Sequence, residues 1–200
     1  MTASPQQRAS SLVHILNTQG QGDYIGEPIS QLAHSLQAAH LAKSNNADAE
    51  TVIAALLHDI GQFLPSGEVR TIAHEVRNMT SEGDTGGVGR VGHERLGEEY
   101  LLRLGFSEKV AALVGSHVAA KRYLCATDAA YHGTLSEASK KSLLFQGGPM
   151  QGRELQDWSS NAWCEEMCQL RRWDDGAKIV GLEVAPADAY QAMIEQHLAR

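Results

Sequence analysis

Apolar residues recur along this chain at intervals of three and four positions, the spacing of one helix face. The clearest stripe lies between Asp48, a residue typical of helix N-caps, and Gly61, a residue typical of helix ends. Its apolar members are Val52, Ile53, Leu56, Leu57 and Ile60. This stretch predicts a helix with one side against a core.

The same signals predict further helices, and strand-like alternation is nearly absent. Pro28 suits the first turn of a helix. Ser107 and Ser136 suit N-caps, and Gly105 suits a helix end. The stretch QGGPM at 146–150 predicts a turn. We expect helices over residues 11–18, 28–44, 48–60, 93–104, 107–123, 136–144, 154–173 and 186–198. Together they predict an all-α fold packed around one core.

Residues 65–92 interrupt this helical pattern. The segment starts with the run PSG and ends with the glycine-rich stretch SEGDTGGVGRVG. Between these breaks, residues 68–79 are compatible with a short helix. Because long loops in compact domains are often functional, we interpret residues 65–92 as a long lid-like loop insertion.

Composition indicates an ordinary globular chain whose size suits one domain over residues 1–200. Of these residues, 42% are hydrophobic and 20% are charged, which is enough apolar material for one substantial core. The net charge of −7 disfavours non-specific binding of nucleic acid, which requires a basic surface. No apolar run approaches the ~18 residues that span a bilayer, so we expect no membrane partner.

The cysteines and the N-terminus bear on the cellular compartment. Cys125, Cys164 and Cys168 form an odd and sparse set, which suggests reduced thiols. Residues 1–10 are polar and lack the basic-then-apolar layout of a signal peptide. We therefore expect a cytoplasmic protein. The sequence does not indicate its oligomeric state.

Four histidines and two aspartates stand at positions that suit metal binding. They are His34, His58, Asp59, His93, His117 and Asp174. Neutral imidazole and carboxylate suit first-row transition metals, and six donors exceed the needs of one tetrahedral zinc ion. The set fits two metal ions with Asp59 as a bridge. Two such ions would also compensate the charge of a buried carboxylate.

The order of these residues, together with several longer motifs, resembles one family. The motifs are DYIGE (23–27), QLAHSLQ (31–37), HD (58–59), GHE (92–94), SHVAAKRYL (116–124), EASKKSL (137–143), QGGPM (146–150) and RRWDD (171–175). The chain resembles the HD-domain superfamily of metal-dependent phosphohydrolases and oxygenases. The resemblance is closest to mixed-valent di-iron oxygenases that cleave the carbon–phosphorus bond of 1-hydroxyphosphonates. It implies a single HD-domain helical bundle with a catalytic core over residues 20–180.

The resemblance implies that the six donors hold two iron ions in the mixed-valent Fe(II)/Fe(III) state, with Asp59 bridging them. By the same resemblance, Lys121 and Arg171 bind the phosphonate of the substrate. Ser139 and Gln146 line the same pocket. All four residues lie within the quoted motifs.

Two residues of the DYIGE motif receive further roles from the resemblance. Tyr24 occupies an iron position until substrate displaces it, and Glu27 attends a cationic nitrogen of the substrate. A phosphonate dianion requires Lys or Arg and an ammonium requires a carboxylate, so the two ends together orient the substrate. We therefore expect Tyr24, Glu27 and Lys121 to be the catalytic residues.

The implied function is an Fe- and O2-dependent dioxygenase of organophosphonate catabolism. The stretch from Asp59 to His93 is longer than in the family member that acts on 2-amino-1-hydroxyethylphosphonate, which suggests a different head group. We expect (R)-1-hydroxy-2-(trimethylammonio)ethylphosphonate, cleaved to glycine betaine and phosphate. A trimethylammonium group favours carboxylate, aromatic and thioether surface. Glu27, Tyr24, Asn78 and Met79 are the candidates to provide it.

Three other functions remain open at this point. The first is oxygenation of 2-amino-1-hydroxyethylphosphonate to glycine and phosphate. The second is a metal-dependent phosphohydrolase, which needs no O2. The third is an inactive module that only binds a ligand, which is disfavoured because all six metal donors are kept.

Overall fold

The computed structural model describes residues 3–24, 26–72 and 90–200. Over these residues the secondary structure is helical, and one isolated β-bridge joins Asp23 to Ser30. The helices are α1 (Pro5–Gln19), α2 (Gln31–Ser44), α3 (Ala49–Leu57), α4 (Ile60–Phe63), α5 (Ser66–Ile72), α6 (His93–Leu104), α7 (Glu108–Thr127), α8 (Tyr131–Thr134), α9 (Glu137–Phe145), α10 (Gly152–Ser159), α11 (Cys164–Gly176), the 3-10 helix η1 (Ala187–Tyr190) and α12 (Gln191–Leu198). The predicted all-α fold is confirmed.

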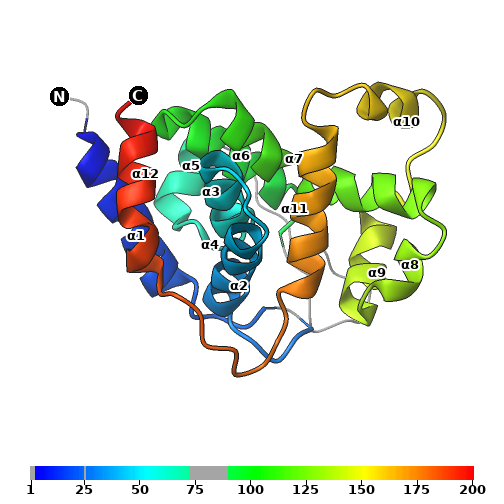
Figure 1. Cartoon of the computed structure of the whole chain (residues 1–200), viewed down its shortest axis with the longest axis horizontal. Coiled ribbons are helices and arrows are strands. Elements are labelled where there is room, and N and C mark those ends of the chain that lie inside the picture. Colours follow the sequence, from blue (N-terminus) through cyan, green and yellow to red (C-terminus); the bar gives the residue numbers. More distant parts are fainter. Residues whose placement is uncertain (1–2, 25, 73–89) are drawn as a thin grey trace.

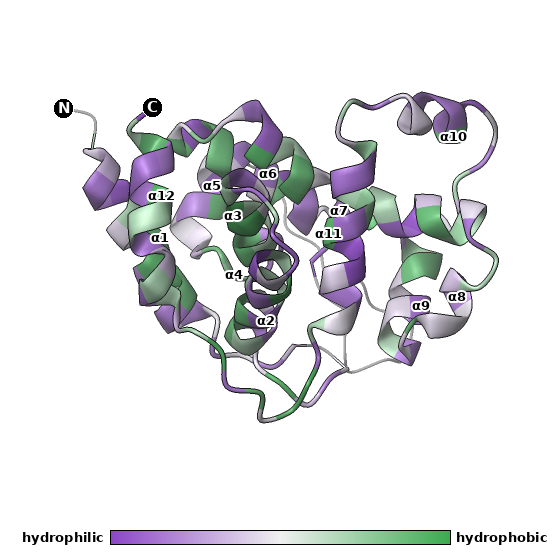
Figure 2. Ribbon diagram, viewed as in Figure 1, coloured by the Kyte–Doolittle hydropathy of each residue, from purple (hydrophilic) through white to green (hydrophobic). Residues whose placement is uncertain are grey.

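Helix α3 lies in the middle of the hydrophobic core. Its residues from Thr51 to Leu57 are all buried, which fits a helix that has neighbours on every side. Helices α2, α7 and α11 pack against it, and α6 packs along α7 (Figure 1). Figure 2 shows hydrophobic colour on α3 and mostly hydrophilic colour on the peripheral helix α10. These central helices carry most of the polar residues discussed below.

The two ends of the molecule differ in their elements. Helices α1 and α12 pack side by side and cover one end of the core (Figure 1). Helices α8, α9 and α10 lie at the other end, around the C-terminal half of α7. A small separate apolar cluster of Leu124, Tyr131 and Leu135 joins α7 to the α8 region.

The three predicted N-caps are confirmed. The side chains of Asp48, Ser107 and Ser136 each accept a hydrogen bond from the backbone N–H three residues later, at 2.8, 3.3 and 3.3 Å. Each such cap contributes roughly 1 kcal/mol to stability. Asp48 also pairs with the Nζ atom of Lys109 at 2.6 Å, which ties the start of α3 to the start of α7. Gly105 ends α6 with a φ of 86°, as predicted.

The predicted helix end at Gly61 is wrong. The helix stops before His58, the chain turns at His58 and Asp59, and Gly61 lies buried inside α4. A Cβ atom on Gly61 would overlap the carbonyl oxygen of His93 and lie 2.9 Å from the backbone nitrogen of Gly97. Glycine is required here because α4 approaches α6 closely, and not because a helix terminates.

Two predicted helix starts also differ from the structure. The first helix begins at Pro5, because Ser4 forms a capping box with the following turn. The second begins at Gln31 and not at Pro28, because the side chain of Ser30 accepts the N–H of Ala33 at 3.0 Å.

The predicted single helix over 154–173 is two helices, α10 and α11. The chain turns between them at Asn161, whose Oδ1 atom accepts the backbone N–H of Trp163 at 2.9 Å. Asparagine competes for backbone hydrogen bonds in this way and interrupts helices. The short helix α8 was not expected from the sequence pattern.

The predicted lid-like insertion over 65–92 is described only at its two ends. Helix α5 lies at its start and packs against α6. At its other end, Arg90 donates to the carbonyl oxygens of Gly61 and Leu64 at 3.0 and 3.3 Å. Residues 73–89, with the proposed substrate residues Asn78 and Met79, lie outside the described residues. The lid and the single-domain boundary both stay predictions.

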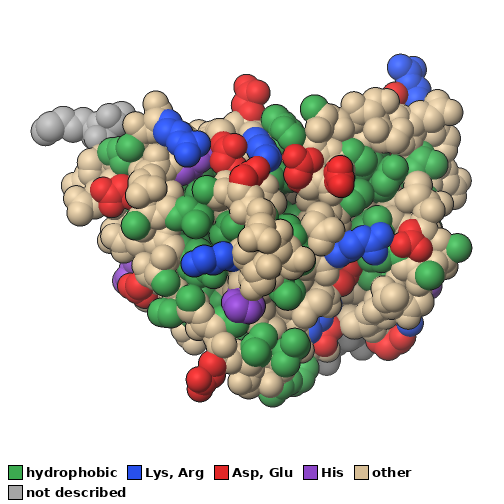
Figure 3. Space-filling model, in the orientation of Figure 1, with side chains coloured by type: hydrophobic (Ala, Val, Ile, Leu, Met, Phe, Trp, Pro, Cys, Tyr) green, Lys and Arg blue, Asp and Glu red, His purple; other side chains and the backbone are tan. Residues whose placement is uncertain are grey.

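The surface is mixed in charge on the face shown in Figure 3, where both acidic and basic side chains are scattered over the face. In the part of the chain that the structure describes, no helix has both the length and the apolar character to cross a membrane.

We predict that Gly61→Ala lowers the free energy of unfolding by at least about 2 kcal/mol, because the new methyl group meets backbone that cannot move aside. Thermal and urea unfolding measure the change. Gly67→Ala is the matched control, since a Cβ atom on Gly67 in α5 meets nothing within 4 Å. Equal stability of the two variants would contradict the close approach of α4 and α6.

Candidate metal centre

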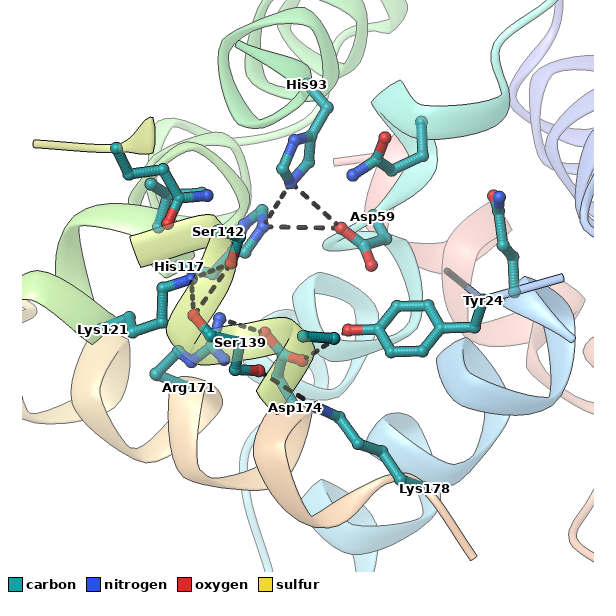
Figure 4. Close-up of a pocket in the computed structure, with 15 residues that line it drawn as sticks. Tyr24, Asp59, His93, His117, Lys121, Ser139, Ser142, Arg171, Asp174 and Lys178 are labelled. Atoms are coloured by element: carbon teal, nitrogen blue, oxygen red, sulfur yellow. Dashed lines mark hydrogen bonds and ion pairs between the residues drawn. The ribbon is translucent and has the colours of Figure 1, made fainter. Parts of the chain in front are cut away.

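Six side chains from five regions of the chain converge in the core. His34 comes from α2, His93 begins α6 and His117 lies in α7. The break between α3 and α4 contributes two further side chains, and α11 contributes the sixth. All six, including His58, Asp59 and Asp174, are at most 4% exposed. The structure thus brings together every residue that the sequence predicted as a metal ligand. Figure 4 shows Asp59, His93, His117 and Asp174 among them.

The four histidines form two pairs. The Nε2 atoms of His34 and His58 lie 3.0 Å apart, and those of His93 and His117 lie 2.9 Å apart. Each of the four Nδ1 atoms lies 2.8–2.9 Å from a backbone carbonyl oxygen. A carbonyl oxygen only accepts, so each Nδ1 carries the hydrogen and each neutral ring presents an Nε2 lone pair. Two lone pairs at this distance repel unless a cation lies beside them.

Local backbone explains how three of these rings are oriented. His58, His93 and His117 each donate from Nδ1 to the carbonyl three residues earlier. The fourth ring, His34, instead donates to the carbonyl of Ala177 after α11, at 2.9 Å. Such bonds hold the tautomer and direction of a metal-binding imidazole.

Asp59 lies between the two histidine pairs. Its Oδ1 atom is 3.2 Å from His93 Nε2 and 3.5 Å from His117 Nε2. Its Oδ2 atom is 3.5 Å from His58 Nε2 and 3.7 Å from His34 Nε2. One carboxylate therefore presents one oxygen to each pair, which is the arrangement of a bridging ligand.

Two clusters of metal-binding groups thus share one residue. One contains His34, His58 and Asp59, and the other contains Asp59, His93 and His117. The donors are imidazole and carboxylate without a thiolate, which suits first-row transition metals. The arrangement is consistent with a dinuclear metal site, and the residues present fit such a site.

The sixth residue adds charge to the first cluster. Asp174 places Oδ1 at 3.2 Å from His34 Nε2 and 3.8 Å from His58 Nε2. Burial alone would raise the pKa values of Asp59 and Asp174, but the imidazoles around Asp59 and the Arg171 guanidinium beside Asp174 hold both pKa values well below the usual range. Burial lowers the pKa of His58 to about 4. At neutral pH the site therefore offers carboxylates and a neutral imidazole, the forms that bind metal.

Tyr24 covers one side of the first cluster. Its ring stacks on His34 with centroids 3.9 Å apart, and its hydroxyl lies 3.4 Å from Asp174 Oδ1. Burial and the nearby carboxylates raise its pKa well above the usual value, so it is a neutral phenol. Gly26, with a φ of 82°, holds this loop against α9, since a Cβ there would lie 2.7 Å from the Cβ of Ala138.

A small cavity of about 70 Å³ opens beside the clusters. Lys121 and Arg171 line it together with Ser139 and Gln146, as the sequence predicted. Figure 4 shows Lys121 and Arg171 extending toward the same region as Asp59 and His117. The cavity therefore combines the metal-binding clusters with a lining of cations and hydroxyl groups.

Lys121 is a buried cation with neutral partners. It is 2% exposed, and its Nζ atom donates to Ser142 Oγ at 2.7 Å and to the Ser139 carbonyl at 3.4 Å. Among the described residues no carboxylate forms an ion pair with it. Burial, with help from Arg171, lowers its pKa to about 7. An anionic ligand would stabilise the charged form of this lysine by supplying a counter-ion.

Arg171 is held in place by three neighbours. Its guanidinium lies 2.7 Å from Asp174 Oδ2, pairs with Asp175, and donates from Nε to the Tyr131 hydroxyl at 3.2 Å. Tyr131 in turn donates to Asp175. Tyr131 and Asp175 were not predicted from the sequence, although Asp175 belongs to the same RRWDD motif.

One predicted residue, Glu27, is placed differently from the others. It does not line the cavity, and its Oε1 atom lies 3.4 Å from the Nζ atom of Lys178. Lys178 itself lines the cavity and was not predicted. It lies in the stretch 178–184 that carries no recognisable sequence motif, so only the fold brings it to the site.

Comparison with known proteins assigns the chain to a family. The HD domain family model matches residues 32–155, more than half of the chain. The chain is 38% identical over 198 residues to a hydroxymethylphosphonate dioxygenase of Gimesia maris, covering 99% of this chain and 92% of that protein. It is 35% identical over 188 residues to a [1-hydroxy-2-(trimethylamino)ethyl]phosphonate dioxygenase (glycine-betaine-forming) of Leisingera caerulea, covering 92% and 89%. An uncharacterized protein of Acanthamoeba polyphaga mimivirus is 32% identical over 193 residues, covering 96% and 83%.

We predict that the two clusters load metal separately but share Asp59. After anaerobic loading with Fe(II), the native chain is expected to hold two ions. The variant His93→Ala should hold about one, and Asp59→Ala should hold close to none, because both clusters lose a charged donor. Metal analysis by mass spectrometry measures the stoichiometry.

The control for this prediction is His40→Ala, which removes an exposed histidine from the same helix as His34 and should leave two ions bound. Two ions in Asp59→Ala would show that this carboxylate is not shared between the clusters.

Proposed function

Since the chain belongs to the HD-domain family and is related over nearly its whole length to phosphonate dioxygenases, we propose that it is an Fe- and O2-dependent oxygenase that cleaves the carbon–phosphorus bond of a 1-hydroxyphosphonate. The overall reaction converts the hydroxyphosphonate and O2 into a carboxylate, phosphate and a proton. Both oxygen atoms of O2 are consumed in this balance, and no external reductant is needed.

The observation that carries this proposal is the position of the buried Lys121 beside two metal-binding clusters, with no carboxylate paired to it among the described residues. The cavity next to the clusters is lined by Lys121 and Arg171. Metal-binding clusters alone would suit many reactions. A cationic cradle directly beside them suits a substrate with a phosphonate group close to its reacting carbon.

The five residues of the two clusters, together with Asp174, are proposed to hold two iron ions in the mixed-valent state, with Asp59 shared. Iron supplies the one-electron chemistry with O2 that protein side chains lack. The chain supplies the donors, their orientation through the Nδ1 hydrogen bonds, and burial from water.

We assign the phosphonate to Lys121 and Arg171, with Ser139 and Gln146 as neutral partners. An ammonium and a guanidinium bind a phosphonate with charge-assisted hydrogen bonds. The side chain of Arg171 is already ordered by Asp174 and Asp175, so little conformational entropy is lost on binding. Fixing the phosphonate fixes the neighbouring hydroxyl carbon relative to the clusters.

We assign Tyr24 a protective role at the first cluster. Its phenol lies against His34 and beside Asp174, on the side that faces the cavity. A neutral phenol on a buried metal site excludes water until the substrate takes its place. Movement of the short loop that carries Tyr24 is therefore part of the proposed binding step.

The reaction class does not by itself specify the head group of the substrate. The sequence favoured (R)-1-hydroxy-2-(trimethylammonio)ethylphosphonate as substrate, with glycine betaine as product, and this stays a prediction. One relative is named for the trimethylamino compound and another for hydroxymethylphosphonate. The relatives therefore support the hydroxyphosphonate class without selecting one member of it.

The proposed reaction predicts strict coupling of phosphate release to O2. Iron-loaded protein incubated with a panel of 1-hydroxyphosphonates should release one phosphate for each O2 consumed, measured with an oxygen electrode and a phosphate assay. The same mixtures without O2 should release no phosphate. Release of phosphate from esters by the Mn(II)-loaded protein in the absence of O2 would instead indicate a phosphohydrolase.

We predict that Lys121→Gln raises KM for the phosphonate about 100-fold and leaves the iron content unchanged. Loss of one charge-assisted contact of this kind costs about 2–3 kcal/mol. Lys121→Arg should recover part of the affinity because it keeps the charge.

Lys109→Gln is the matched control for Lys121, because Lys109 lies on the same helix and pairs with Asp48 far from the cavity. Unchanged KM in Lys121→Gln would remove this lysine from the binding of the phosphonate.

A further inference from the structure

Lys178 is a rigidly placed cation at one edge of the cavity. It follows the C-terminal end of α11, and the backbone is held on both sides of it. The carbonyl of Ala177 accepts from His34 Nδ1, and Ile179 exchanges two hydrogen bonds with the Gln37 side chain at 2.8 and 2.9 Å. The Lys178 side chain is 12% exposed.

The ammonium of Lys178 faces the two groups at this end of the site that are best suited to receive a cation. It lies 3.4 Å from the Glu27 carboxylate and 5.5 Å from the centre of the Tyr24 ring. It also donates to Ser139 Oγ at 3.3 Å, and Figure 4 shows it extending toward Ser139. It donates to Ser136 Oγ at 3.5 Å as well, so four partners determine its position.

Few other groups near the cavity would receive a positive charge. Among the described residues that line it, the carboxylates are Asp59, which belongs to both metal-binding clusters, and Asp174, which lies 3.2 Å from His34 Nε2 of the first cluster. Apart from imidazoles, Tyr24 provides the aromatic ring in this lining. A cationic head group would therefore compete with Lys178 for Glu27 and Tyr24, and it would be repelled by Lys178 itself.

We propose that Lys178 is a specificity-determining residue that acts as a built-in counter-cation to Glu27 and directs the site to compact 1-hydroxyphosphonates without a positive charge, of which hydroxymethylphosphonate is the simplest. This inference rests on the proposed function for the reaction that follows binding. It runs opposite to the trimethylammonio head group expected from the sequence.

The size of the ligand agrees with this proposal. Hydroxymethylphosphonate has no atoms beyond its hydroxyl carbon, so it can occupy the cavity without displacing Lys178. A trimethylammonium group that contacts Glu27 would have to displace Lys178.

The test compares binding of four ligands to the iron-loaded full chain by anaerobic calorimetry, where no turnover occurs. The ligands are hydroxymethylphosphonate, 2-amino-1-hydroxyethylphosphonate, 1-hydroxy-2-(trimethylammonio)ethylphosphonate and 1-hydroxy-3,3-dimethylbutylphosphonate. The last has the shape of the trimethylammonio compound without its charge. The native chain should bind hydroxymethylphosphonate at least about 100-fold more tightly than either cationic ligand, and the neutral isostere more tightly than the trimethylammonio compound.

Variants then show whether Lys178 causes this order. Lys178→Met should improve binding of the trimethylammonio compound relative to hydroxymethylphosphonate at least about 10-fold, because Glu27 and Tyr24 become available. The double variant Lys178→Met/Glu27→Gln should lose that improvement. Lys140→Met is the control, since Lys140 pairs with Glu137 on the outer surface of α9.

Two results would overturn the proposal. The first is that the native chain binds either cationic ligand as tightly as hydroxymethylphosphonate. This measurement does not depend on the folding of any variant. The other is an equal loss of affinity for all four ligands in Lys178→Met, which would make Lys178 a phosphonate-binding residue.

Aerobic phosphate release separates this proposal from the proposed function. The expected binding order with no phosphate released from any ligand would leave the role of Lys178 intact and refute the oxygenase. Phosphate release with a preference for a cationic substrate would support the oxygenase and refute the proposed role of Lys178.

Discussion

The structure depends on one electrostatic constraint, which is the need for positive charge beside a buried carboxylate. Two pairs of imidazoles flank this carboxylate, and within each pair the two rings present lone pairs to each other. The Nδ1 atoms are committed to backbone carbonyls, so the Nε2 atoms 2.9–3.0 Å apart have no proton to share in their neutral form. Asp59 adds negative charge at 4% exposure. Such a cluster is unfavourable without cations, so we expect metal binding to stabilise this core.

The arrangement of the helices brings the residues of this centre together. The chain leaves α3 before His58, and the close approach of α4 to α6 at Gly61 brings Asp59 next to His93. Helix α11 adds Asp174 and the Arg171 that neutralises its outer oxygen. The centre is therefore assembled from helix ends and one helix break as much as from helix faces, and it lies at the meeting point of the central helices.

Three cations line the cavity in the part of the chain that the structure describes, and their partners give them different roles. Arg171 is paired with two carboxylates, Lys121 contacts a hydroxyl and a carbonyl, and Lys178 faces Glu27. Lys121, which has no ion-paired carboxylate among the described residues, attracts an anion most strongly, since it gains a counter-ion on binding. Arg171 and Lys178, which are paired with carboxylates, contribute to the shape of the cavity and to its selectivity. The same residue type thus performs separate tasks according to the charges packed against it.

The sequence alone determined the features that depend on neighbouring residues: the helical class, the caps at Asp48, Ser107 and Ser136, the six candidate metal donors and the family resemblance. These signals are short-range, so they can be read along the chain. Tertiary structure decided what depends on contacts between distant segments. It assigned the histidines to pairs and brought Lys178 to Glu27 across 151 positions of chain. It also gave a packing role to Gly61, a glycine that in the sequence resembles a helix end. Local patterns carry no information about such contacts, because they arise only when separate helices pack against one core.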